Sequence, residues 1–151
     1  MTWAGVGRIA KVEGLMNRHQ YIAILSDHLT STLDALEIIP DMPAREDLIF
    51  QQDNDPKHTS KDAKNWFASR GIVLLDWPAQ SPDLNPIEHL WGILKTRIGK
   101  RPEAPKGILD LWSVVQYEWG KIGVDTCRAL IESMPRRCKA VIRARGGPTK
   151  Y

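Results

Sequence analysis

The sequence predicts an α/β fold in which a parallel sheet is followed by a helical C-terminal tail. Two short apolar runs, residues 48–50 and 72–75, have strand character, and a helical pattern separates them. Strands that alternate with helices are typical of parallel sheets. Only helical patterns come later, so we expect an α/β core over residues 1–101 and a basic helical extension of the same domain over residues 102–151.

Composition narrows the class of protein. The 151 residues are 42% hydrophobic, which suits one domain, and the net charge of +3 permits a phosphate-rich partner without requiring one. Cys127 and Cys138 have no zinc-binding spacing and indicate a reduced protein. Because no membrane span or signal peptide is evident, we expect an intracellular protein without a membrane partner, nuclear if the organism is eukaryotic.

The first elements follow from local signals. Residues 3–12 predict a short hairpin that turns at Gly5 and Gly7. Asn17 and Gln20 have the spacing of a capping box, and apolar side chains recur behind them every three or four residues. These are Ile22, Leu25, Leu29, Leu33 and Leu36. The segment therefore predicts an amphipathic helix.

Four further helices are expected. The first covers residues 59–70 and ends at Gly71, a residue typical of the position after a helix. The second begins at Asn85, with a proline next to it, and carries an apolar stripe. The stripe consists of Ile87, Leu90, Trp91, Leu94 and Ile98. The last two are expected around residues 108–119 and 127–134.

Asp53 is the first candidate for chemistry, because it follows a strand at the sheet edge where ligands and catalytic groups collect. Its turn also contains Asp55, Lys57 and His58. Two interpretations stay open: Asp53 binds a metal or acts in catalysis, or it only forms an Asx turn before the helix. Lys57 and His58 likewise either contact phosphate or serve as cap and surface groups.

Glu88 is the second candidate. It lies three residues after Asn85, so a capping-box role and a catalytic role both fit. Its place beside the apolar stripe, behind a loop restricted by Pro82 and Pro86, favours a function. Two carboxylates from separate elements suit Mg²⁺ or Mn²⁺, and a pair of such ions suits phosphodiester chemistry, which normally needs a third carboxylate.

Basic residues dominate the end of the chain, since no acidic residue follows Glu132. Arg136, Lys139 and Arg143 share one face of the expected helix. Such a face is suited to phosphates, and we expect DNA contacts from this segment. The expected DNA-binding residues are Arg136, Arg137, Lys139, Arg143 and Arg145.

Residues 50–59 and 77–91 closely resemble mariner-superfamily transposases, especially the branch that contains Sleeping Beauty. Thirty-four residues lie between Asp53 and Glu88, as they do between the second Asp and the Glu of that branch's Asp-Asp-Glu triad. The resemblance implies a partial ribonuclease H-like fold that lacks the early strands. It implies Mg²⁺-dependent (or Mn²⁺-dependent) cleavage of transposon ends and strand transfer to target DNA, with Asp53 and Glu88 as catalytic metal ligands. Supporting or loop-shaping roles fall to Asp55, Lys57, His58, Asp83 and Asn85.

The chain departs from the family in one respect. The family's first Asp lies on a strand further upstream than Met1, and Asp27 and Asp34 do not replace it because they lie within the expected helix. We therefore expect weak metal binding, no catalysis by this chain alone, and marginal stability or association, with another copy or a full-length transposase as partner besides DNA. The alternatives are a DNA-binding or partner-binding module without catalysis and a decayed copy with no present role.

Overall fold

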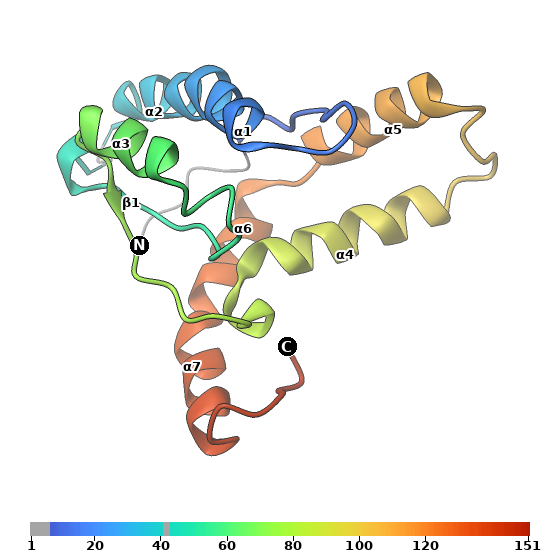
Figure 1. The fold of residues 1–151 in the computed structure, drawn as a ribbon. Coiled ribbons are helices and arrows are strands. Elements are labelled where there is room, and N and C mark those ends of the chain that lie inside the picture. The colour runs from blue at the N-terminus through green and yellow to red at the C-terminus, as the bar shows by residue number, and fades with distance from the viewer. Residues whose placement is uncertain (1–6, 41–42) are drawn as a thin grey trace. The chain divides into compact units, whose positions relative to one another are not determined.

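The computed structural model describes residues 7–40 and 43–151, which form two compact units (Figure 1). We call Gly7–Gln80 the N-terminal unit and Ser81–Tyr151 the C-terminal unit. The boundary between them differs from the one expected near residue 101. The boundary comes earlier because the helix that follows Asn85 packs against helices that come later in the chain.

The N-terminal unit begins with one long helical segment. It consists of α1 (Arg18–Ile24), a π-helical turn over Leu25–Leu29, and α2 (Thr30–Glu37). The expected capping box is confirmed: the side chain of Asn17 accepts from the amide of Gln20, whose own side chain accepts from the amide of Asn17. The π turn was not predicted; such turns hold one residue more than an α-helical turn.

The two strands of this unit are short and parallel. β1 (Ile49–Phe50) follows a 3₁₀ turn over Arg45–Asp47, and β2 (Val73–Leu74) lies beside it, with Ile49 opposite Val73. The crossover is α3 (Lys61–Ser69), so the predicted strand, helix, strand order is confirmed. The side chain of Ser60 caps α3, and Gly71 ends it with a φ of +64° that suits glycine.

The core of the N-terminal unit lies between α1, α3 and the strands (Figure 1). The Phe67 ring stacks on Phe50 with ring centres 5.3 Å apart and meets the edge of Trp66 at 5.1 Å. Burial of a side chain such as Phe67 contributes about 2 kcal/mol. The Trp66 indole nitrogen donates to the Ser26 hydroxyl at 2.8 Å, which joins α3 to the π turn.

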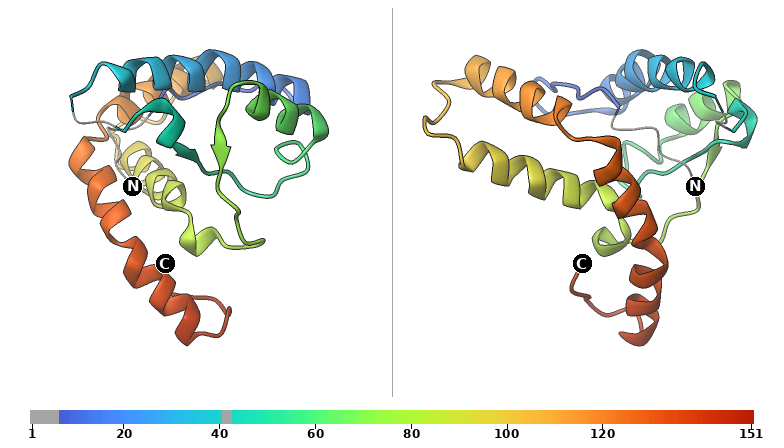
Figure 2. Two further views of the ribbon diagram at one scale, coloured as in Figure 1. Left: turned by 90° about the vertical axis from the view of Figure 1, so that its left-hand side faces the viewer. Right: turned by 180° about the vertical axis from the view of Figure 1, so that it is seen from behind.

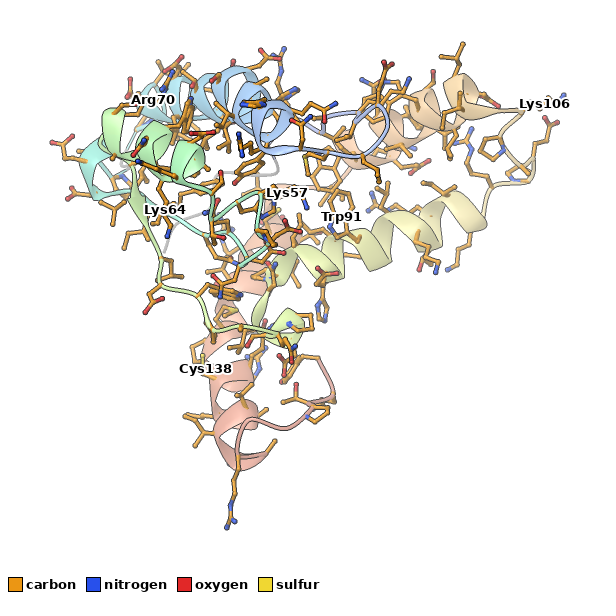
Figure 3. All side chains as sticks on the ribbon, in the orientation of Figure 1. Lys57, Lys64, Arg70, Trp91, Lys106 and Cys138 are labelled. Atoms are coloured by element: carbon orange, nitrogen blue, oxygen red, sulfur yellow. The ribbon has the colours of Figure 1, made fainter. Side chains whose placement is uncertain are left out.

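The C-terminal unit is helical. A 3₁₀ turn over Pro82–Leu84 leads into four helices: α4 (Pro86–Gly99), α5 (Ile108–Gly120), α6 (Val124–Glu132) and α7 (Met134–Arg143). Figure 2 shows α4 and α5 as a helical hairpin. The rings of Trp91 and Trp119 stack between them with centres 5.0 Å apart, and Trp91 is labelled in Figure 3.

Two expectations about elements are corrected. Residues 7–12 contain no strand, and the rest of the expected hairpin lies outside the described residues. The helix expected around residues 127–134 ends at Glu132, and a new helix starts at Met134, because Pro135 has no amide proton to continue the first. Within residues 7–40 and 43–151, no helix has the length and apolar character needed to cross a membrane.

Candidate active site

Asp53 lies in the loop after β1, and its two carboxylate oxygens have different surroundings. Oδ1 lies 2.6 Å from Nδ1 of His58 and accepts from the amide of Asp55 at 3.2 Å. Oδ2 has no hydrogen-bond partner among the described residues, and the side chain is 58% exposed. One oxygen is therefore held by the protein while the other is available to a cation.

His58 is itself supported by the unit's core. The Tyr21 ring packs on the imidazole with ring centres 4.2 Å apart. The Gln52 side chain donates to the carbonyl of His58 at 3.2 Å and accepts from the Tyr21 hydroxyl. Burial, helped by the charge of Asp53, raises the pKa of Tyr21, so its hydroxyl remains a donor at alkaline pH as well.

No local pattern in the sequence assigns these roles to Tyr21 and Gln52. Tyr21 belongs to α1 and lies 31 positions before Gln52, so only the packing of α1 near the end of β1 brings them together. One feature of the sequence pointed to a supporting role for Gln52, namely that it directly precedes Asp53. The support of the candidate carboxylate therefore follows from the tertiary structure.

The rest of the loop is braced by its own side chains. Lys57 (Figure 3) pairs with Asp55, and this side-chain hydrogen bond, with a second from the Lys57 amide, lowers the pKa of Asp55. Asn54 donates to the carbonyl of Trp77 at 2.7 Å, which ties the loop to the segment after β2. Lys57 is thus engaged with Asp55, whereas the sequence alone left a phosphate contact open.

Glu88 lies in the first turn of α4, is exposed, and has no hydrogen bond or ion pair among the described residues. The capping-box interpretation is not supported: Asn85 caps α4 through Ile87, but its own amide donates to the carbonyl of Pro82. Glu88 lines an open groove of about 730 Å³ along α4. Its lining residues are Pro82, Glu88, His89, Gly92, Ile93, Thr96, Arg97 and Tyr151.

Asp83 belongs to the 3₁₀ turn before Glu88 and is held from two directions. Its carboxylate accepts from the Thr149 hydroxyl at 2.9 Å, and its carbonyl accepts from Arg137 of α7 at 2.9 Å. Asp83 and Asn85 thus shape the approach to α4.

No group of three or more His, Cys, Asp or Glu side chains suited to a metal occurs within residues 7–40 and 43–151.

The expected DNA-binding residues divide into two classes. Arg136, Lys139, Arg143 and Arg145 are exposed on α7 and just beyond it. Arg137 is only 1% exposed, and its guanidinium is used by groups of the protein. We therefore remove Arg137 from the DNA-binding set, because a buried side chain is not available to a phosphate.

Comparison with known proteins identifies the family. Residues 1–107 match the family described as DDE superfamily endonuclease. The chain belongs to this superfamily. It is 42% identical over 151 residues to the Tcb1 transposase of Caenorhabditis briggsae, which covers 97% of the chain and 50% of that protein. It is 41% identical over 152 residues to the Tc1 transposase of Caenorhabditis elegans, which covers 99% and 52%. This DDE superfamily chain spans about half the length of the curated relatives it matches.

Solved structures show the fold of this DDE superfamily member. The catalytic domain of Mos1 transposase, solved with raltegravir and Mn, has a TM-score of 0.77 at 19% identity and covers 91% of the chain and 67% of that domain. A crystal structure of the Mos1 mariner catalytic domain gives a TM-score of 0.76 at 17% identity, with 91% and 66% covered. The predicted ribonuclease H-like fold and the resemblance to mariner-type transposases are confirmed.

Proposed function

We propose that this DDE superfamily chain belongs to a transposase that acts in DNA transposition by metal-dependent phosphodiester hydrolysis and strand transfer, and that it contributes Asp53 and Glu88 as metal-binding carboxylates. The observation that carries the proposal is the state of these two side chains. Both are exposed, and within the described part of the chain Glu88 has no hydrogen bond or ion pair and Oδ2 of Asp53 has no partner, while Oδ1 of Asp53 is fixed by His58. Family membership and the transposase relatives support it.

The chemistry of the donor set fits Mg²⁺ or Mn²⁺, which bind carboxylate oxygens. When bound, such an ion activates the attacking oxygen and stabilises the leaving one. The chain's own residues orient the ligands: His58 holds Asp53, and the cap at Asn85 sets the first turn that carries Glu88. Asp53 and Glu88 each supply one carboxylate, which is few of the ligands such an ion needs, so we expect weak binding.

The partner we infer is DNA. The exposed bases of α7 and its C-terminal end offer positive charge for phosphates. These are Arg136, Lys139, Arg143 and Arg145. Association with a second copy or with a longer transposase, and a nuclear location in a eukaryotic cell, stay predictions.

Titration of the isotopically labelled chain with Mn²⁺ tests the metal-binding role, because a bound paramagnetic ion broadens nearby amide resonances. We expect broadening at residues 53–55 and at residues 87–89. Asp53→Asn and Glu88→Gln should each reduce it at the substituted site, whereas Asp62→Asn, which changes an exposed carboxylate of α3, should leave both unchanged. If the two sites share one ion, each variant also weakens broadening at the other site. Broadening at neither site would contradict the metal-binding role.

A DNA-binding module without catalysis is the second candidate, favoured by the exposed bases of α7. Nicking of duplex DNA that needs Mg²⁺ and is lost in Asp53→Ala supports the enzyme. Salt-sensitive DNA binding that is unchanged in Asp53→Ala, without any nicking by the parent chain, supports the binding module.

A further inference from the structure

Arg137 of α7 is the most deeply buried charged residue described in the C-terminal unit, with 1% exposure. Its Nε donates to the Ser133 hydroxyl at 2.8 Å, and Nη1 donates to the carbonyl of Asp83 at 2.9 Å. Nη2 lies 3.2 Å from Nδ1 of His89, and the guanidinium lies 5.2 Å from the centre of the Tyr151 ring. Every nitrogen of this side chain therefore faces a group of the protein.

The surroundings of Arg137 include no direct ion pair among the described residues. Burial lowers the pKa of Arg137, opposed by Tyr151 and the Asp83 carboxylate, and a guanidinium remains charged in proteins. A buried charge without a carboxylate contact is costly unless its hydrogen bonds are satisfied. Arg137 meets this condition through Ser133, Asp83 and His89, so the positions of these groups are informative.

Two of the groups that Arg137 contacts, the Asp83 carbonyl and His89, lie close to Glu88 in the sequence. Through the Asp83 carbonyl, Arg137 fixes the 3₁₀ turn whose next residue, Asn85, caps α4. Through His89, it contacts the residue directly after Glu88. Because a guanidinium only donates, His89 accepts at Nδ1 in this contact.

We propose that Arg137 is a positioning residue that sets the orientation of Glu88 along the groove of α4, by clamping the Asp83 turn and His89 against α7. This inference rests on the proposed function in one respect, the metal-binding role of Glu88. The clamp itself is a statement about the loop and is testable without metal or DNA.

The test compares Arg137→Met, Arg137→Lys and the matched control Arg136→Met, an exposed arginine of the same helix. Hydrogen exchange of the amides at residues 84–90 measures the clamp. We expect Arg137→Met to accelerate their exchange about tenfold, the value of about one lost hydrogen bond, while amides of α5 stay within about twofold. Arg137→Lys keeps the charge but has one donating nitrogen in place of three, so it should recover part of the protection. Arg136→Met should match the parent chain.

Broadening by Mn²⁺ distinguishes a role of Arg137 in positioning Glu88 from general support of the structure. In Arg137→Met we expect weaker broadening at Glu88 and unchanged broadening at residues 53–55, with partial recovery in Arg137→Lys. Equal exchange at residues 84–90 in Arg137→Met and the parent chain would overturn the clamp. Broadening at Glu88 that is unchanged in Arg137→Met despite faster exchange would overturn the positioning role. Absence of broadening in the parent chain would instead contradict the proposed metal function, and exchange would still decide the clamp.

Discussion

Tyr21 connects the hydrophobic core of the N-terminal unit to the candidate carboxylate. Its ring is 8% exposed and packs on His58, while its hydroxyl donates to Gln52, the residue before Asp53. The hydroxyl is useful only in its protonated form, because phenolate cannot donate. Burial raises the pKa of Tyr21, so this donor persists at alkaline pH, where a solvated tyrosine loses its proton.

Tyr21→Phe should show this in the pH dependence of stability. At pH 7 we expect a loss of about 1 kcal/mol, since the Gln52 oxygen loses its donor. In the parent chain the unfolded tyrosine titrates near pH 10.0, before the folded one, so stability falls as the pH rises above 10.0. The phenylalanine variant has no hydroxyl to titrate at this position and should lose less stability over the same alkaline range. Urea unfolding at neutral and alkaline pH measures both effects.

Tyr117→Phe provides the matched control, because that side chain is 58% exposed. It should leave the alkaline slope of the parent chain in place. An equal slope in the parent chain and in Tyr21→Phe would contradict the assigned burial of the hydroxyl.

Individual residues differ in how far the sequence could predict them. Asp53 and Glu88 stand in short contiguous motifs, so their candidacy needs no tertiary structure. The burial of Arg137 could not be predicted, because it stands among exposed bases and one of its partners, Asp83, is 54 positions away. The sequence shows that a residue is charged, whereas its burial depends on partners from distant segments.

The helices whose ends are set by local side chains were the most predictable elements. The α1 cap needs only Asn17 and Gln20, and the end of α3 needs only Gly71. The π turn depends on a distant partner, since Ser26 in it accepts from Trp66, 40 positions later. The strands were expected as runs of three and four residues. In the structure, only two residues of each run form backbone pairs, because pairing requires both backbones to lie in register.

Asn17→Ala tests the contribution of the cap. The Asn17 side chain accepts from the amides of His19 and Gln20, which otherwise have no partner in the helix. We expect the variant to lose about 1 kcal/mol of stability to unfolding. Its loss should be local as well, with faster hydrogen exchange at residues 19–21. Lys64→Ala, on the exposed face of α3, should change stability by less than about 0.5 kcal/mol, and an equal loss in both variants would count against the cap.

For the whole molecule, the distribution of charge says more than its sum. The net charge of +3 is small, but no acidic residue follows Glu132, and five of the six bases that come after it are exposed. A local concentration of positive charge attracts phosphates even when the total charge is low. The one base that the structure withdraws from this surface, Arg137, leaves the exposed set on α7 otherwise intact.

Salt dependence of DNA binding tests the basic surface directly. Each phosphate contact releases counterions and contributes about 0.9 to the slope of log affinity against log salt concentration. The triple variant Arg136→Gln, Lys139→Gln, Arg143→Gln should therefore reduce that slope by between about 2 and 3 and weaken binding to any duplex sequence alike. Fluorescence anisotropy of a labelled duplex at several salt concentrations measures it. The control Lys61→Gln, Lys64→Gln, Lys100→Gln removes three exposed bases elsewhere and so has the same net charge. If both triple variants lose the same slope, the attraction belongs to the overall charge and α7 is not the DNA-binding surface.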